Sequence, residues 1–321
     1  LQRIEQTGVE TSVGWWNSLV AGDFDEDGDT DYIAGNLGEN NGFQVTKEYP
    51  LRLTAKDVDG NGSIDPVLAC YMKTSMTDDT KRLFPVHFWD EINSQSPKFR
   101  NKYARYKQYS KITMQDLLSP EELKDAVVLE ANQLRSAYIE NEGEGRFTLH
   151  ALPMAVQVAP VNGMVTTDVN RDGHQDVLLV GNDYGNEVFA GRYDAFTGLV
   201  LLGDGKGGFR VVPSEQSGFY VPGDAKALVR VAGAQGELFL ASQNRDSVKV
   251  FRPVMARPGR FVQPGPLDCR LEVVYSNGRK ERREIFYGAG YLSQSSRRIM
   301  LPADVREATL YTFAGVGRKA L

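Results

Sequence analysis

The chain has 321 residues, of which 41% are hydrophobic, and a formal net charge of −5 at pH 7. A chain of this length can bury a large core, and we expect one large domain together with a small one. No apolar run approaches the roughly 18 residues that a membrane helix needs, and no signal peptide is visible, so we expect no membrane span in this chain. Because the first residue is Leu1 rather than Met, we expect the sequence to be a fragment of a longer protein.

Three aspartate-rich segments of nine residues, at 23–31, 57–65 and 168–176, are the most informative feature of the sequence. In each, oxygen-bearing side chains stand at the first, third, fifth and ninth positions, and glycine stands at the fourth or sixth position or at both. This spacing can place several oxygen ligands around one cation. The ligands that we expect, with the seventh residue of each loop contributing its backbone carbonyl, are Asp23, Asp25, Asp27, Asp29, Asp31, Asp57, Asp59, Asn61, Ser63, Asp65, Asp168, Asn170, Asp172, His174 and Asp176.

Calcium is the cation that these ligands favour, because it accepts six to eight oxygens in a flexible shell. The loops hold no cluster of thiols or imidazoles of the kind that zinc requires. They are not EF-hands, since the twelfth position is Ala34, Leu68 or Leu179 instead of glutamate. The alternative is that they are Asp/Gly turns without metal. Five aspartates in the first loop would repel one another unless a cation offset their charge. Since three such loops are present, we expect about three Ca²⁺ ions.

Apolar, β-prone segments flank each loop, so the sequence predicts a strand, a loop and a second strand in each case. The predicted strands are residues 17–22 and 31–36, 51–55 and 65–71, and 163–167 and 176–182. These units resemble FG-GAP/VCBS repeats, the calcium-loop blades of integrin-type β-propellers. The glycine-rich hairpins at 141–147 and 203–209 resemble the turn between the outer strands of such a blade.

The C-terminal region carries a second resemblance. Residues 275–283, followed by 288–296 with the string Tyr-Leu-Ser-Gln-Ser, resemble the ASPIC/UnbV module that closes many bacterial proteins of this kind. The Trp-Pro-Ser-Gly ending of that module is absent from the chain. The two resemblances together imply a propeller region over residues 1–256 and a small β module over 257–321.

The fold class that we expect is all-β, a β-propeller with about four repeat units that can be part of a larger propeller. The predicted units are residues 14–50, residues 51 onward resuming at 136–153, residues 161–213, and residues 221–253. The last unit has strand-like alternation at 227–232 and 237–241 but no acidic loop.

A helical insertion at about 78–133 interrupts the second unit. Ser119 and Glu122 form a capping box with Pro120 at the first helical position, and the apolar spacing predicts a helix that continues to Leu134. Residues 97–112 combine six lysines and arginines with four aromatic residues and no acid. A helix of this kind can bind nucleic acid or an anionic glycan, or it can pack its aromatic side chains against the propeller and leave its lysines in water.

Other motifs favour structure over chemistry. Glycines at 203, 205 and 208 match a dinucleotide fingerprint by letter, but a predicted strand that ends at Pro213 follows where a helix is required. Asn61 lies in a glycosylation sequon, where attachment would compete with a metal ion. Cys70 and Cys269 are expected to be buried thiols. Nucleophile elbows, zinc-protease helices and Cys-His pairs are absent from the sequence.

We therefore expect a non-enzymatic calcium-binding protein that serves in binding or adhesion, extracellular or at a bacterial cell surface, with calcium stabilising the blade loops. Its partners would be a protein or glycan ligand, with nucleic acid a less favoured partner, and it can associate with missing blades or with itself. One alternative is a polysaccharide lyase or hydrolase built on a propeller. Another is an assembly segment of a longer surface protein. Fold does not fix function, and the sequence does not name the ligand.

Overall fold

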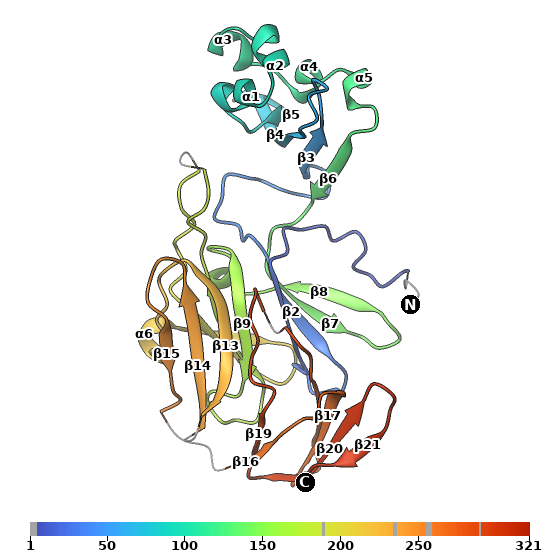
Figure 1. Ribbon diagram of the computed structural model, residues 1–321, viewed down its shortest axis with the longest axis vertical. Coiled ribbons are helices and arrows are strands. Elements are labelled where there is room, and N and C mark those ends of the chain that lie inside the picture. The colour runs from blue at the N-terminus through green and yellow to red at the C-terminus, as the bar shows by residue number, and fades with distance from the viewer. Residues whose placement is uncertain (1–4, 188–189, 234–235, 255–258, 289) are drawn as a thin grey trace. The chain divides into compact units, whose positions relative to one another are not determined.

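The computed structural model describes residues 5–187, 190–233, 236–254, 259–288 and 290–321. The protein is mostly β, with several antiparallel sheets and a few short helices, so the all-β prediction is confirmed (Figure 1). The chain divides into two compact units. Unit 1 contains Trp16–Asn40 and Arg135–Leu321 with the N-terminal residues up to Glu10, and unit 2 contains Thr11–Trp15 and Asn41–Leu134.

The first sheet of unit 1 is assembled from two distant parts of the sequence. Its strands, in spatial order, are β1 (Ser18–Gly22), β2 (Asp31–Gly35), β7 (Ala137–Asn141) and β8 (Phe147–Ala151). Tyr32 of β2 pairs with Ile139 of β7, although more than 100 residues separate them in the sequence. In the sequence, the largest part of unit 2 therefore lies between the second and third strands of this sheet.

The second and third sheets of unit 1 follow in sequence order. The second sheet contains β9 (Val161–Thr167), β10 (Asp176–Gly181), β11 (Leu199–Gly203) and β12 (Phe209–Pro213), and the third contains β13 (Ala225–Gly233), β14 (Gly236–Gln243) and β15 (Lys249–Phe251). The 3-10 helix η1 (Met154–Val156) precedes β9, and the short helix α6 (Ser214–Ser217) follows β12. The strands predicted at 227–232 and 237–241 are confirmed as β13 and β14.

Packing between these sheets explains why β10 is apolar along its whole length. One side of the second sheet, with Val177 and Leu179, packs with Val20 and Ile33 of the first sheet. The other side, which includes Leu178, packs against the third sheet. Every residue of β10 is buried, as expected for a strand that lies in a sheet covered on both faces.

The C-terminal module forms two sheets. The strands β16 (Gly259–Val262) and β19 (Ile299–Pro302) pair with each other, and a four-stranded sheet contains β18 (Lys280–Glu284), β17 (Asp268–Tyr275), β20 (Val305–Thr312) and β21 (Gly317–Lys319). Buried apolar residues from both sheets form one core. The boundary predicted at 256/257 and Ala289 of the resembling motif lie outside the described residues.

Unit 2 has its own sheet and core. The sheet contains, in order, β5 (Asp78–Pro85), β4 (Asp65–Ser75), β3 (Leu51–Lys56) and β6 (Val127–Ala131). The helices are α1 (Trp89–Gln95), α2 (Pro97–Lys102), α3 (Tyr106–Tyr109), α4 (Met114–Leu117) and α5 (Pro120–Leu123). Val67 and Ala69 of β4 pack against Ile92, Phe99 and other buried helical residues.

This arrangement corrects the predicted second repeat. Residues 51–56 pair with β4 and β6 of unit 2, whereas residues 137–151 complete the first sheet of unit 1. The predicted repeat joins these two segments, because both follow a strand-and-turn pattern and sequence spacing does not reveal pairing across a long insertion. The insertion is also larger than 78–133, and it contains a whole sheet as well as helices.

Two helical predictions need correction. Residues 97–112 contain two short helices, α2 and α3, which are separated by the non-helical residues 103–105. Phe99 is fully buried in the core of unit 2, and Tyr103 and Tyr109 pack against that core, so these aromatic residues have a structural role within their own unit. The capping box of Ser119 and Glu122 is present, but its helix ends at Leu123 and β6 follows. The branched residues Val127 and Val128 favour a strand there.

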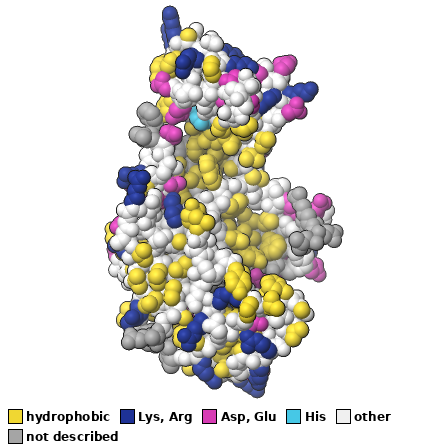
Figure 2. Space-filling model, in the orientation of Figure 1, with side chains coloured by type: hydrophobic (Ala, Val, Ile, Leu, Met, Phe, Trp, Pro, Cys, Tyr) yellow, Lys and Arg dark blue, Asp and Glu magenta, His cyan; other side chains and the backbone are white. Residues whose placement is uncertain are grey.

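On the face shown in Figure 2, apolar side chains gather in several patches, and Lys and Arg side chains gather at the lower end of the view. Within the described part of the chain, no helix is long and apolar enough to cross a membrane.

Candidate metal loops and an adjoining cavity

Each of the three acidic loops connects two adjacent antiparallel strands, as the sequence predicts. The first loop lies between β1 and β2, the second between β3 and β4, and the third between β9 and β10. The first and third loops belong to unit 1 and the second belongs to unit 2.

The three loops share one pattern of hydrogen bonds. The carboxylate at position nine accepts the backbone N–H of position two, in Asp31–Phe24 (3.0 Å), Asp65–Val58 (2.9 Å) and Asp176–Val169 (2.7 Å). The side-chain oxygen at position three accepts the N–H of position five, in Asp25–Asp27 (3.2 Å), Asp59–Asn61 (3.2 Å) and Asn170–Asp172 (3.1 Å). Position five in turn accepts the N–H of position seven, in Asp27–Asp29 (2.9 Å), Asn61–Ser63 (2.7 Å) and Asp172–His174 (2.9 Å).

The backbone of the loops is equivalent as well. Position six is glycine in all three, with φ of 96° at Gly28, 89° at Gly62 and 96° at Gly173. A side chain would strain the backbone at these values, which explains the glycine. Position four also has positive φ in each loop, although it is Glu26 in the first and Arg171 in the third. The loops are thus three copies of one local fold.

This local fold gathers oxygen atoms. Carboxylate oxygens of Asp23, Asp25 and Asp27 lie within 4.8 Å of one another, and those of Asp57, Asp59 and Asp65 form a second such group. The buried Oδ1 of Asp29 has no hydrogen-bond partner among the described residues. A buried carboxylate oxygen is costly without a partner, and a cation would supply one. The donor set therefore fits a hard divalent cation held by oxygen atoms.

Electrostatics point the same way in unit 1. Burial raises the pKa of Asp23 to about 7, and nearby carboxylates, including Glu281, contribute to the rise. Burial and the neighbouring Asp27 and Asp31 raise the pKa of Asp29 to about 6. Without a cation, these carboxylates are held in a site that disfavours their charged form.

In the first and third loops, the carboxylate at position nine also bonds to the third strand of the sheet. Asp31, which is fully buried, accepts the N–H of Asn141 (2.9 Å) and the hydroxyl of Tyr138 (2.9 Å). Asp176 accepts the N–H of Gly203 in the second sheet (3.0 Å). Sequence reasoning missed these partners. A signal was present, because Asn141 and Gly203 begin the two glycine-rich hairpins that the sequence singles out.

The imidazole of His174 faces away from the ligands of its own loop. Its Nδ1 lies 2.8 Å from Oε1 of Glu26 in the first loop, and Glu26 also meets Arg279 of the C-terminal module at 3.2 Å. Gln175, next to His174, donates to Glu281 of the module (2.8 Å). The first and third loops are therefore linked to each other and to the module, whereas the sequence had suggested no role for this imidazole.

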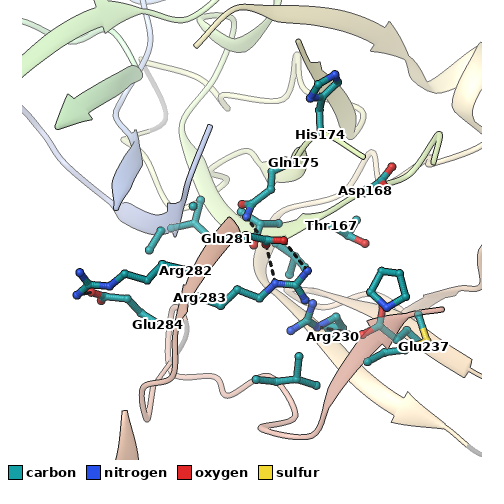
Figure 3. A pocket seen from close by; sticks show the side chains of 18 of the residues that line it. Thr167, Asp168, His174, Gln175, Arg230, Glu237, Glu281, Arg282, Arg283 and Glu284 are labelled. Carbon is teal, nitrogen blue, oxygen red and sulfur yellow. Dashed lines mark hydrogen bonds and ion pairs between the residues drawn. The ribbon is translucent and has the colours of Figure 1, made fainter. Parts of the chain in front are cut away.

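A cavity of about 620 Å³ adjoins these two loops. Residues of the first and second sheets, β13, β14 and the C-terminal module line it (Figure 3). Glu281 is 4% exposed and makes a two-point ion pair with Arg283, at 2.6 Å and 3.1 Å. Burial alone would raise the pKa of Glu281, but Arg283, Tyr275 and Arg279 outweigh it and lower this pKa to about 2. Glu281 is thus a poor proton donor or acceptor near neutral pH.

The remaining sequence motifs have structural roles. Gly203 is the last residue of β11, Gly205 and Gly208 lie in the turn between β11 and β12, and a strand follows them as predicted. Cys70 and Cys269 are free thiols of intermediate burial.

The chain matches no protein-family model, and no curated protein matches it. The acidic loops and the cavity are therefore the features that bear on its function.

Proposed function

We propose that this protein is a calcium-binding, propeller-type binding protein in which the metal ions stabilise the loops and the protein recognises its ligand without catalysing a reaction. The observation that carries the proposal is that one loop fold occurs three times. Side-chain oxygens stand at the same positions in each loop, the hydrogen bonds to the backbone are equivalent, and position six is always glycine. Calcium is the cation that matches this oxygen-rich, flexible donor set.

The stacking of sheets in unit 1 supports a propeller. The second sheet packs between the first and third, and the outer faces of these two carry apolar side chains that remain in part accessible. Leu19 on β1 is 56% exposed, and Val250 on β15 is 58% exposed beside the half-buried Leu240 of β14. Further sheets on these faces would bury them, in agreement with a propeller that has more blades than unit 1 provides.

The resemblance to FG-GAP/VCBS repeats and to the ASPIC/UnbV module supports the same proposal, and the location that we propose with it is outside the cell or at a bacterial surface. Loop sites of extracellular modules often bind calcium with dissociation constants of about 10⁻⁴ to 10⁻³ M. Extracellular calcium fills such sites. A binding function also agrees with the cavity, since its carboxylate Glu281 is held ionised by arginine.

Metal content and thermal unfolding test the proposal together. We expect about three calcium ions per chain by elemental analysis after dialysis against calcium. Each occupied site should stabilise its unit by about 2.7 kcal/mol at a calcium concentration about 100 times its dissociation constant. Chelator should therefore lower the melting temperature markedly, and magnesium should replace calcium poorly. Absence of bound metal together with an unchanged melting temperature would overturn the proposal.

A further inference from the structure

The cavity beside the two loops of unit 1 has the dimensions of a ligand site. Its volume of about 620 Å³ lies within the range of about 300–1,000 Å³ that small-molecule sites occupy. Its walls come from three sheets and the C-terminal module, and every lining residue belongs to unit 1.

Arg230 of β13 presents an open guanidinium group to this cavity. The side chain is mostly buried, and its ion pair is made through Nε, 3.4 Å from Oε1 of Glu237. Among the residues that the structure describes, the two Nη groups of Arg230 have no hydrogen-bond partner. These two groups form the planar fork that binds a carboxylate through two parallel hydrogen bonds.

A second guanidinium lies beside the first. Arg283 is fixed by its two-point contact with Glu281 and by the hydroxyl of Tyr275 (3.3 Å). In Figure 3, Arg230 and Arg283 lie next to each other in the cavity. Burial lowers the pKa of Arg230, and the charge of Arg283 contributes to this decrease. Two buried cations that repel each other would be stabilised by an anion between them.

The other lining groups limit which anion fits. Glu237 and Glu281 already pair with the two arginines, so a doubly charged phosphate would meet more repulsion from these carboxylates than a singly charged carboxylate would. Neutral polar side chains also line the cavity, and they can hydrogen-bond with ligand hydroxyl groups. They are Thr166, Thr167, Asn277, Gln294 and Ser295.

The walls of the cavity are held in place by the acidic loops. Gln175 bonds to Glu281, and Glu26 bonds to Arg279, so side chains from the third and first loops contact the module at the cavity. A site that is rigid before its ligand arrives loses less entropy on binding.

We propose that this cavity binds a hydroxylated small carboxylate of the hexuronate class, with the carboxylate on the Nη groups of Arg230 and the hydroxyl groups on the neutral polar lining. This inference rests on the proposed binding function and gives the chemical class of the ligand.

Titration calorimetry on the full chain in calcium tests it, with glucuronate and galacturonate as the ligands. Glucose is the comparison ligand that has the hydroxyl groups without the charge. Inorganic phosphate is the comparison ligand that has a charge without the hydroxyl groups of a sugar. We expect saturable binding of at least one uronate with one site per chain, and much weaker binding of both comparisons. If glucose or phosphate binds as well as the uronates, the assignment is wrong. It is also wrong if neither uronate binds with a dissociation constant below about 10 mM, which corresponds to a binding free energy of about −2.7 kcal/mol.

Substitution of Arg230 locates the site. Arg230→Met keeps the length of the side chain and removes the fork, and it should weaken uronate binding by about 10-fold or more, since hydrogen bonds to charged groups contribute about 1.5–3 kcal/mol. Arg306→Met is the matched control, because Arg306 is an exposed arginine of the module that does not line the cavity. Equal affinity of the wild-type chain and Arg230→Met would overturn the assignment.

Hydrogen exchange on the wild-type chain gives an independent result if Arg230→Met does not fold. Saturating uronate should protect the amides of β13 and β18, which carry Arg230 and Arg283. Protection confined to other strands would contradict the proposed site. The metal measurement is separate: three bound calcium ions without uronate binding would overturn only the ligand assignment, whereas a chain without metal would overturn the proposed metal loops.

Discussion

Oε1 of Glu26 lies 2.8 Å from Nδ1 of His174, so the first acidic loop contacts the third through their side chains. Glu26 stands at position four of its loop, between two expected ligands, and His174 stands at position seven of the other. Arg279 reaches the same carboxylate oxygen from the C-terminal module. One carboxylate therefore joins two acidic loops and the module, so a cation bound in either loop would be expected to affect the stability of the module.

We expect Glu26→Gln to loosen the module. The substitution removes the charge that faces Arg279, whose side chain is 18% exposed, and the loss should be about 1 kcal/mol because partly accessible ion pairs contribute modestly. Hydrogen exchange of β18, measured in calcium, should become faster in the variant.

Glu130→Gln is the control for this substitution, because it removes an ion pair with Arg52 inside unit 2. Its effect should be confined to unit 2. Equal exchange of β18 in the wild-type chain and in Glu26→Gln would show that the contact does not hold the module. A double-mutant cycle with Arg279→Met then measures the coupling energy itself.

Asp25→Asn should change stability in opposite directions with and without calcium. Asp25 accepts one backbone N–H through Oδ1, and asparagine can keep that bond. Burial and the charges of Asp31 and Asp27 raise the pKa of Asp25, so removing its charge should stabilise the metal-free chain slightly. In calcium the variant should be less stable than the wild-type chain, because one ligand charge is lost. Melting temperatures in chelator and in calcium give both signs, and a loss of equal size in the two conditions would contradict a ligand role.

The metal-free protein should lose stability as the pH rises from about 4 to about 7. Burial raises the pKa of Asp23 to about 7 and that of Asp176 to about 6. A group whose pKa is higher in the folded state binds its proton more tightly there, so its contribution to stability is complete below the unfolded pKa of 3.8 and is lost as the pH rises through the folded value. Denaturant unfolding in chelator at pH 5 and pH 8 should show this loss. Asp23→Asn should reduce the difference, and an unchanged difference in that variant would exclude Asp23 as the source.

Local patterns in the sequence predicted local structure well. All three pairs of strands around the acidic loops are present, because alternating β-branched and apolar residues between Asp/Gly turns have few other ways to fold. The loop residues themselves also have the expected arrangement, since the spacing of oxygens and glycine determines which backbone N–H groups each side chain can reach.

Long-range pairing could not be predicted in the same way. The strand at Ala137 completes the first sheet across an inserted unit, and its sequence carries no mark of which earlier strand it pairs with. The helix predicted after Ser119 ends at Leu123 because the following residues pair with β3, so tertiary pairing overrides the helical spacing. The cavity was missed for a related reason. Arg230 and Arg283 lie more than 50 residues apart, and only folding of the module brings them together.

Tyr138→Phe should destabilise unit 1 by about 1.5–3 kcal/mol. The hydroxyl of Tyr138 donates to the fully buried carboxylate of Asp31, and a hydrogen bond to a charged group contributes about that much stability. Tyr109→Phe is the matched control: Tyr109 donates to the neutral backbone carbonyl of His87 in unit 2 at 2.6 Å, where the loss should be about 0.5–1.5 kcal/mol. Hydrogen exchange in each unit, monitored as denaturant is added, separates the loss in unit 1 from the loss in unit 2, since the two units need not unfold together. A smaller loss for Tyr138→Phe than for Tyr109→Phe would mean that Asp31 does not depend on the tyrosine, and that the two backbone N–H groups of Phe24 and Asn141 are sufficient to hold this carboxylate in place.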